Sequence, residues 1–155
     1  MNYARLVVAA LGATVAYFIY GFVVFGLLIA NDFRPYPAVY RSAEGIQSHM
    51  PIGIASTFIA IFVAAVIYAK GFEGARGAAE GARFGLLVGI FSVCGFVLHN
   101  YVNLNIGLKL TLEQAAGYFT EWILVGTIIG LIYRPIAERT KPTRDPRTEG
   151  LSYTA

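Results

Sequence analysis

The chain has 155 residues, of which 57% are hydrophobic and only 14% are charged. Soluble domains carry about 25% charged residues, so this composition and a mean hydropathy of +0.61 argue against an ordinary water-soluble domain. The net charge of +3 is too small to indicate a protein that binds nucleic acid. The single cysteine, Cys94, excludes an internal disulfide.

Apolar stretches long enough to cross a bilayer, which takes about 20 residues, dominate the sequence. They cover residues 6–31, 50–69, 84–106 and 113–133. The first stretch is too long for a signal peptide and has bulky residues in its second half, so we expect it to be a retained helix.

The fold class that follows is all-α. Residues 1–134 are predicted to form a polytopic membrane domain of four transmembrane helices in an up-down bundle, and residues 135–155 a polar cytoplasmic tail.

The basic residues predict the orientation of this bundle. Of the 12 lysine and arginine residues, all but Arg34, Arg41 and Lys109 fall near the N-terminus, after the second span or in the tail. Because cytoplasmic segments carry the excess of positive charge, both termini are expected on the cytoplasmic side.

Glycines recur at every fourth position in the last two spans. Small residues at this spacing let helix backbones approach closely in lipid, either within the chain or against a partner. The predicted packing positions are Gly81, Gly85 and Gly89 in the third span and Gly126 and Gly130 in the fourth.

Polar residues continue the same helical seams toward the other end of the spans. In α-helical register, His99 and Glu121 fall at similar depth on facing seams and are predicted to meet. The predicted intramembrane polar cluster comprises His99, Asn100, Asn103, Tyr118 and Glu121. An ionisable residue inside a span is a candidate functional site, and a clasp that fixes helix packing is the alternative.

No residue pattern predicts a cofactor or a metal. The only histidines are His49 and His99, and His99 could hold a haem or a pigment as a further alternative. No cysteine, histidine and aspartate cluster has metal-ligand spacing, and neither a catalytic triad nor a phosphate loop is present.

Several short motifs carry a family resemblance. They are Arg83–Gly89, Asn100–Val102, Glu121–Trp122 and Gly130–Pro135. These motifs resemble a family of small, uncharacterised four-helix proteins of the bacterial inner membrane. The resemblance implies the same fold and a bacterial cytoplasmic membrane, but it brings no activity, and His99 lies outside its motifs.

Three functions are compatible with these features. The first is a non-enzymatic accessory or structural subunit of a larger membrane complex, respiratory or photosynthetic, because the glycine seams suit helix packing and little mass lies outside the membrane. Its partners would be the lipid bilayer and other membrane subunits or further copies of the chain, and no nucleic acid. The alternatives are a small oligomeric transporter or channel with a polar site at His99 and Glu121, and a protein that binds haem or pigment.

Overall fold

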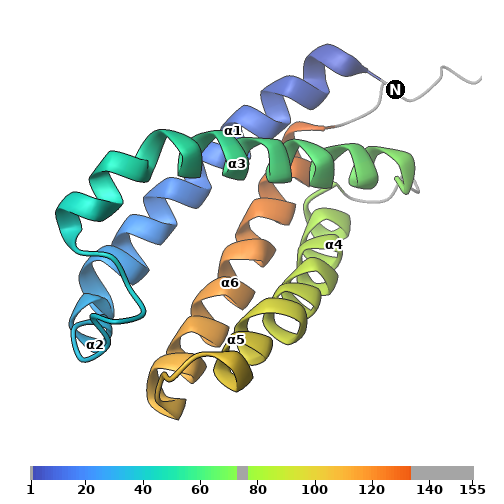
Figure 1. Cartoon of the computed structure of the whole chain (residues 1–155). Helices are drawn as coiled ribbons and strands as arrows, with labels where there is room; N and C mark the ends of the chain where they lie inside the picture. The colour runs from blue at the N-terminus through green and yellow to red at the C-terminus, as the bar shows by residue number, and fades with distance from the viewer. Residues whose placement is uncertain (1, 73–76, 134–155) are drawn as a thin grey trace, which may run out of the picture.

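The computed structural model describes residues 2–72 and 77–133, and within these ranges the chain is helical, with no strand. Four helices are long and apolar enough to cross a membrane. They are Tyr3–Leu28, Ala43–Lys70, Gly77–Asn103 and Leu108–Ile132 (Figure 1). The prediction of an all-α chain with four candidate membrane spans is therefore confirmed, while the predicted tail lies outside the described residues.

Two of the long helices change their winding along their length. The first consists of α1 (Tyr3–Gly21) and a π-helical segment, η1 (Phe22–Leu28), and a short helix, α2 (Ala30–Phe33), follows it. The second is α3 (Ala43–Lys70). The third consists of α4 (Gly77–Ser92), π-helical η2 (Val93–Val97) and α5 (Leu98–Asn103), and the fourth is α6 (Leu108–Ile132).

The helices begin earlier than the apolar stretches, and capping explains where two of them start. α3 begins at Ala43 and not near residue 50, because the Ser42 side chain accepts a hydrogen bond from the Gly45 backbone N–H at 3.2 Å. The Asn2 side chain caps α1 in the same way, through the Arg5 N–H at 3.1 Å. Such caps satisfy backbone donors that lack a partner in the first turn of a helix.

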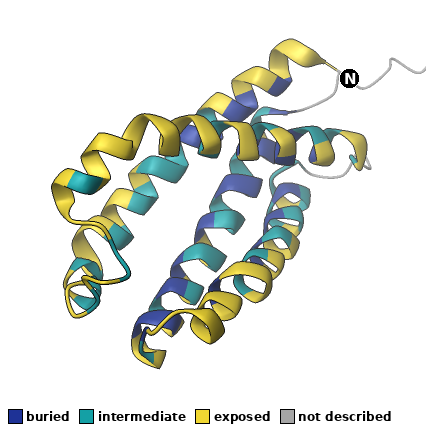
Figure 2. Cartoon of the chain, in the orientation of Figure 1, coloured by how far each residue is buried: buried dark blue, intermediate teal, exposed yellow. Residues whose placement is uncertain are grey.

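α6 is the central helix of the fold, and it packs against α4 on one side and α1 on the other (Figure 1). It runs antiparallel to both of them. Gly81 of α4 lies against Gly126 and Gly130, whereas Gly89 lies against Phe119. Figure 2 shows that α6 is also the helix with the most extensive burial.

Glycines make the contact between α4 and α6 a contact between backbones. A Cβ atom added at Gly85 would lie 2.9 Å from the Cα of Ile123 and closer still to the Trp122 carbonyl oxygen. A Cβ atom added at Gly126 would lie 2.6 Å from the Cα of Gly85. Real side chains do not approach backbone atoms so closely, so these positions have room only for glycine.

α1, α3 and α6 share the main apolar core. This core lies near the N-terminal end of α1, where alanines on α1 allow both neighbours to approach. Its fully buried members are Leu6, Ala9, Ala10, Ala13, Ile61, Ala65, Val125 and Ile129, and Tyr68 and Tyr133 are almost fully buried beside them.

Beyond this core, α3 diverges from the other helices. It crosses α1, and its N-terminal part diverges from α4 and α6 (Figure 1). No residue of α3 before Ile61 is buried. The molecule is therefore a tight group of α1, α4 and α6 from which half of a fourth apolar helix extends.

The glycine contact leads to a stability prediction. Gly85→Leu should lower the free energy of unfolding in detergent micelles by about 1–3 kcal/mol or more, because overpacking forces the two backbones apart. Gly95→Leu is the matched control, since a Cβ atom at Gly95 would meet nothing within 4 Å. Denaturant unfolding that shows equal stability for both variants would contradict the close contact.

Candidate functional site

The carboxyl group of Glu121 lies at the centre of the fold, in the interface between α6 and α1. Glu121 is 0% exposed. Gly21, the last residue of α1, faces it, and a Cβ atom there would lie 3.2 Å from the Oε1 atom of Glu121. The missing side chain at Gly21 therefore gives the carboxyl group its space.

Within the described part of the chain, this buried carboxyl group has no cationic partner, and its nearest polar neighbour is the Tyr17 hydroxyl. Both of its oxygens are buried, and neither has a hydrogen bond of acceptable length and angle. The hydroxyl groups of Tyr17 and Tyr118 are near enough to interact with it electrostatically. A polar group buried without a hydrogen bond costs roughly 1–3 kcal/mol, so Glu121 is hard to explain as a stabilising residue.

The aromatic residues next to Glu121 pack in pairs between α6 and the first span. The rings of Tyr17 and Trp122 meet edge to face with centroids 6.5 Å apart. Phe25 of η1 and Tyr118 of α6 have centroids 4.7 Å apart. Tyr17 and Tyr118, whose hydroxyl groups interact with the carboxyl group, are thus each packed against a second aromatic ring.

The π-helical segment η1 helps to shape this site. It begins directly after Gly21 and places the Phe25 ring against Gly117 of α6, where a Cβ atom would lie 2.8 Å from that ring. π-helical turns are rare and occur frequently at functional sites. Here the π-helical turn adjoins the one fully buried carboxylate residue among the described residues.

Polar contacts continue from Glu121 toward one end of α6. The Tyr20 hydroxyl donates a hydrogen bond to the Gly117 carbonyl oxygen at 3.2 Å. One turn further, the Gln114 side-chain amide donates to the Tyr40 hydroxyl at 3.1 Å. In the opposite direction, α6 buries Val125 and Ile129 in the apolar core.

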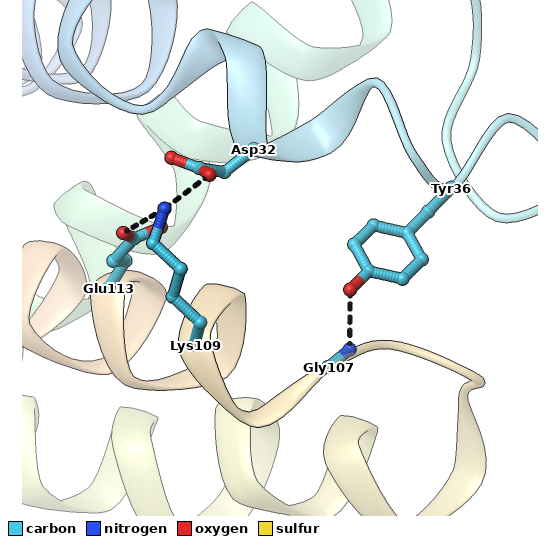
Figure 3. A network of polar contacts seen from close by, with 5 residues as sticks. All are labelled: Asp32, Tyr36, Gly107, Lys109 and Glu113. Carbon is cyan, nitrogen blue, oxygen red and sulfur yellow. Dashed lines mark hydrogen bonds and ion pairs between the residues drawn. The ribbon is translucent and has the colours of Figure 1, made fainter.

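A second polar network closes the same end of the molecule (Figure 3). The Gly107 backbone N–H donates to the Tyr36 hydroxyl at 3.0 Å. The Lys109 ammonium group donates to Asp32 at 2.6 Å and lies 3.5 Å from Glu113. These contacts tie the segment after η1 to the first turn of α6.

The structure does not assemble the predicted polar cluster. His99, Asn100 and Asn103 are exposed on α5, where the Asn103 side chain donates to the His99 carbonyl oxygen at 3.0 Å. Glu121 is buried against α1, so the predicted hydrogen-bonded pair of His99 and Glu121 is not formed. Of the predicted cluster, Tyr118 alone shares the environment of Glu121.

The π-helical segment η2 explains this difference. In an unbroken α-helix with 3.6 residues per turn, His99 would continue the face of the helix that Gly85 and Gly89 present to α6. A π-helical turn is wider and shifts the residues that follow it onto another face. Accordingly, Phe96 is 58% exposed and Val97 is 5% exposed, so the buried face moves by one position before His99.

Sequence reasoning missed the α1 side of the site. Tyr17, Tyr20 and Gly21 lie in the first span, whose composition predicts only an apolar helix. Two tyrosines and a glycine within five residues of an apolar helix were the available signal. The other histidine, His49, is exposed on α3, and its Nδ1 lies 2.8 Å from the Gly45 carbonyl oxygen.

Comparison with known proteins finds no similar protein. No family model matches the chain, and no curated protein or solved structure shows significant similarity to it. Within residues 2–72 and 77–133, no three histidine, cysteine, aspartate or glutamate side chains gather as a metal site would require. Glu121 and its tyrosines therefore form the candidate site on geometry alone.

The absence of a charged partner for Glu121 among the described residues can be tested by stability. Glu121→Leu should leave the free energy of unfolding unchanged or raise it by about 1 kcal/mol or more, because the substitution removes an unsatisfied buried group. Thermal unfolding in detergent, followed by circular dichroism, would measure this. A Glu121→Leu protein clearly less stable than Glu121→Gln would show instead that the carboxyl group holds a structural hydrogen bond.

Proposed function

We propose that the chain is a non-enzymatic integral membrane protein that works as an accessory or structural subunit of a larger membrane assembly. The observation that carries this proposal is the unpartnered half of α3. From Ala43 to Ala60 no residue is buried, although large apolar side chains such as Ile52 and Ile59 lie there. A helix that diverges from its own bundle offers two faces to a neighbouring subunit.

A cleft between α3 and α4 supports this role. Its volume is about 280 Å³, slightly below the roughly 300–1,000 Å³ of small-molecule pockets. It suits the side chains of a neighbouring helix better than a drug-sized ligand. Apart from Ser92 and the Trp122 ring, aliphatic and phenylalanine side chains line it: Ala60, Val63, Ala64, Ile67, Phe84, Val88, Phe91 and Phe96.

Fewer observations support the transporter alternative. In its predicted form it needed His99 and Glu121 in one polar site, and these residues lie in different environments. Glu121 by itself still supports it, because an ionisable residue inside a span is expensive to bury and is usually retained for function. Haem or pigment binding would rest on the exposed His99.

The proposed location is the bacterial inner membrane, with all four helices crossing it and both termini in the cytoplasm. Leu6 near the start of α1 and Tyr133 after α6 lie in one core. This packing supports placing the two ends of the helical region on the same side of the membrane. The distribution of basic residues assigns that side to the cytoplasm.

Reporter fusions test this topology. A phosphatase that is active only outside the cytoplasm should stay inactive when fused at Tyr3 or after Ala155. It should become active when inserted at Pro37, in the opposite connection. Activity at either terminus would contradict the proposed orientation.

The assembly proposal predicts a selective effect of filling the cleft. Ala60→Trp places an indole where a partner side chain would insert, so co-purification of partner subunits from gently solubilised membranes should fall by about tenfold or more, equivalent to ~1.4 kcal/mol. Val102→Trp is the matched control, because Val102 is 80% exposed on α5 outside the cleft. A wild-type chain that migrates alone on native gels would refute the proposal.

A further inference from the structure

We propose that Glu121 is a proton-binding site that exchanges its proton with one side of the membrane only, the side on which the 34–42 connection and Gly107 lie. This inference does not depend on the accessory-subunit proposal. It rests on the burial of the carboxyl group, on the absence of a cationic partner among the described residues, and on the longer run of polar groups on one side of it.

The ligand follows from the geometry. A fully buried carboxylate needs compensation, and among the described residues the Tyr17 hydroxyl is its nearest hydrogen-bonding partner and no ion pair is present. A Cβ atom added at Gly21 would lie only 3.2 Å from the Oε1 atom of Glu121, so α1 already approaches the carboxyl group closely. A proton neutralises the group and occupies no additional volume, whereas a larger cation would have to separate α1 from α6.

The exchange itself is a simple protonation. The carboxylate of Glu121 takes a proton from water to become a carboxylic acid, and the reverse step returns the proton to water. No co-reactant is required.

The neighbouring titratable groups are tyrosines. Tyr17 of α1 and Tyr118 of α6 interact with the Glu121 carboxyl group, and Tyr40 interacts with Tyr118 in turn. From η1 the neighbour is the Phe25 ring, which carries no charge. No described lysine, arginine or histidine forms an ion pair with Glu121. Neutral hydroxyl groups can donate hydrogen bonds to the carboxyl group, but they do not determine whether it is charged.

The direction of exchange follows from what lies above and below Glu121 on α6. Toward the Gly107 end, the hydroxyl groups of Tyr118, Tyr20 and Tyr40 and the side-chain amide of Gln114 offer donors and acceptors. Toward the other end, the polar side chains of α1 are Tyr17 and Thr14, and the Thr14 hydroxyl donates to the Ala10 carbonyl oxygen at 2.7 Å. Beyond them, Val125 and Ile129 pack into a core that contains Leu6 and Ala10, all 0% exposed. Water and protons therefore have a longer run of polar groups to follow in one direction, and in the other direction the run ends at the apolar core.

Infrared difference spectroscopy tests the site directly. The full chain is reconstituted in one orientation in phosphatidylcholine vesicles, and the pH is stepped on one side while buffer and ionophores hold the other side constant. The C=O stretch of a protonated carboxylic acid reports the state of Glu121. Glu121→Gln should lose this band completely, and Glu44→Gln, which alters an exposed carboxylate, should keep it.

The two arms of the experiment have opposite expected results. Raising the pH on the Gly107 side should remove the band, and raising it on the other side should not. Gln114→Leu should slow the loss without abolishing the band. A band that survives in Glu121→Gln, that never responds to pH while the protein stays folded, or that follows the other side or both sides equally would overturn the proposal.

Discussion

The contact between α4 and α6 is made by backbone atoms, since glycines occupy the facing positions on both helices. Lipid tails are as apolar as leucine, so helix association in a membrane depends on close packing and not on exclusion of water. Gly81, Gly85 and Gly126 supply that packing, because a Cβ atom at any of them would meet backbone of the other helix within 3.0 Å. The contact fixes the rotation of α6 about its own axis, and that rotation determines what the opposite face of α6 presents to α1.

What α6 presents to α1 is a carboxyl group that the described part of the fold leaves without a cationic partner. Glycine again makes the arrangement possible, with Gly21 opposite the carboxyl group and Gly117 beneath the Phe25 ring. Natural membrane helices rarely keep an ionisable residue at such a position without a use for it. The tight side of α6 and its polar side thus have different roles: the α4 contact holds the helix, and the α1 contact holds a group that can change its charge.

The sequence revealed the helices and the glycine rows because both signals are local. An apolar run needs only its length to indicate a span, and Gly81, Gly85 and Gly89 need only their spacing to indicate a close-packing face. The residues that neighbour Glu121 in space cannot be inferred from local sequence. The predicted pairing of Glu121 with His99 depended on an unbroken α-helical period through residues 93–97, and η2 breaks that period without any proline or change of composition to signal it. The true neighbours, Tyr17 and Gly21, lie about a hundred residues away in the chain, where no spacing rule connects them with α6.

The central claim is that α6 touches α4 through glycines on one side and buries Glu121 against α1 on the other. Solid-state NMR of the chain in lipid bilayers, with ¹³C only at glycine Cα and glutamate Cδ, tests both contacts in one spectrum. The account predicts cross-peaks between Gly85 and Gly126 and between Gly21 and Glu121. Their absence, while the cross-peaks between glycines four residues apart within α4 remain visible, would contradict it.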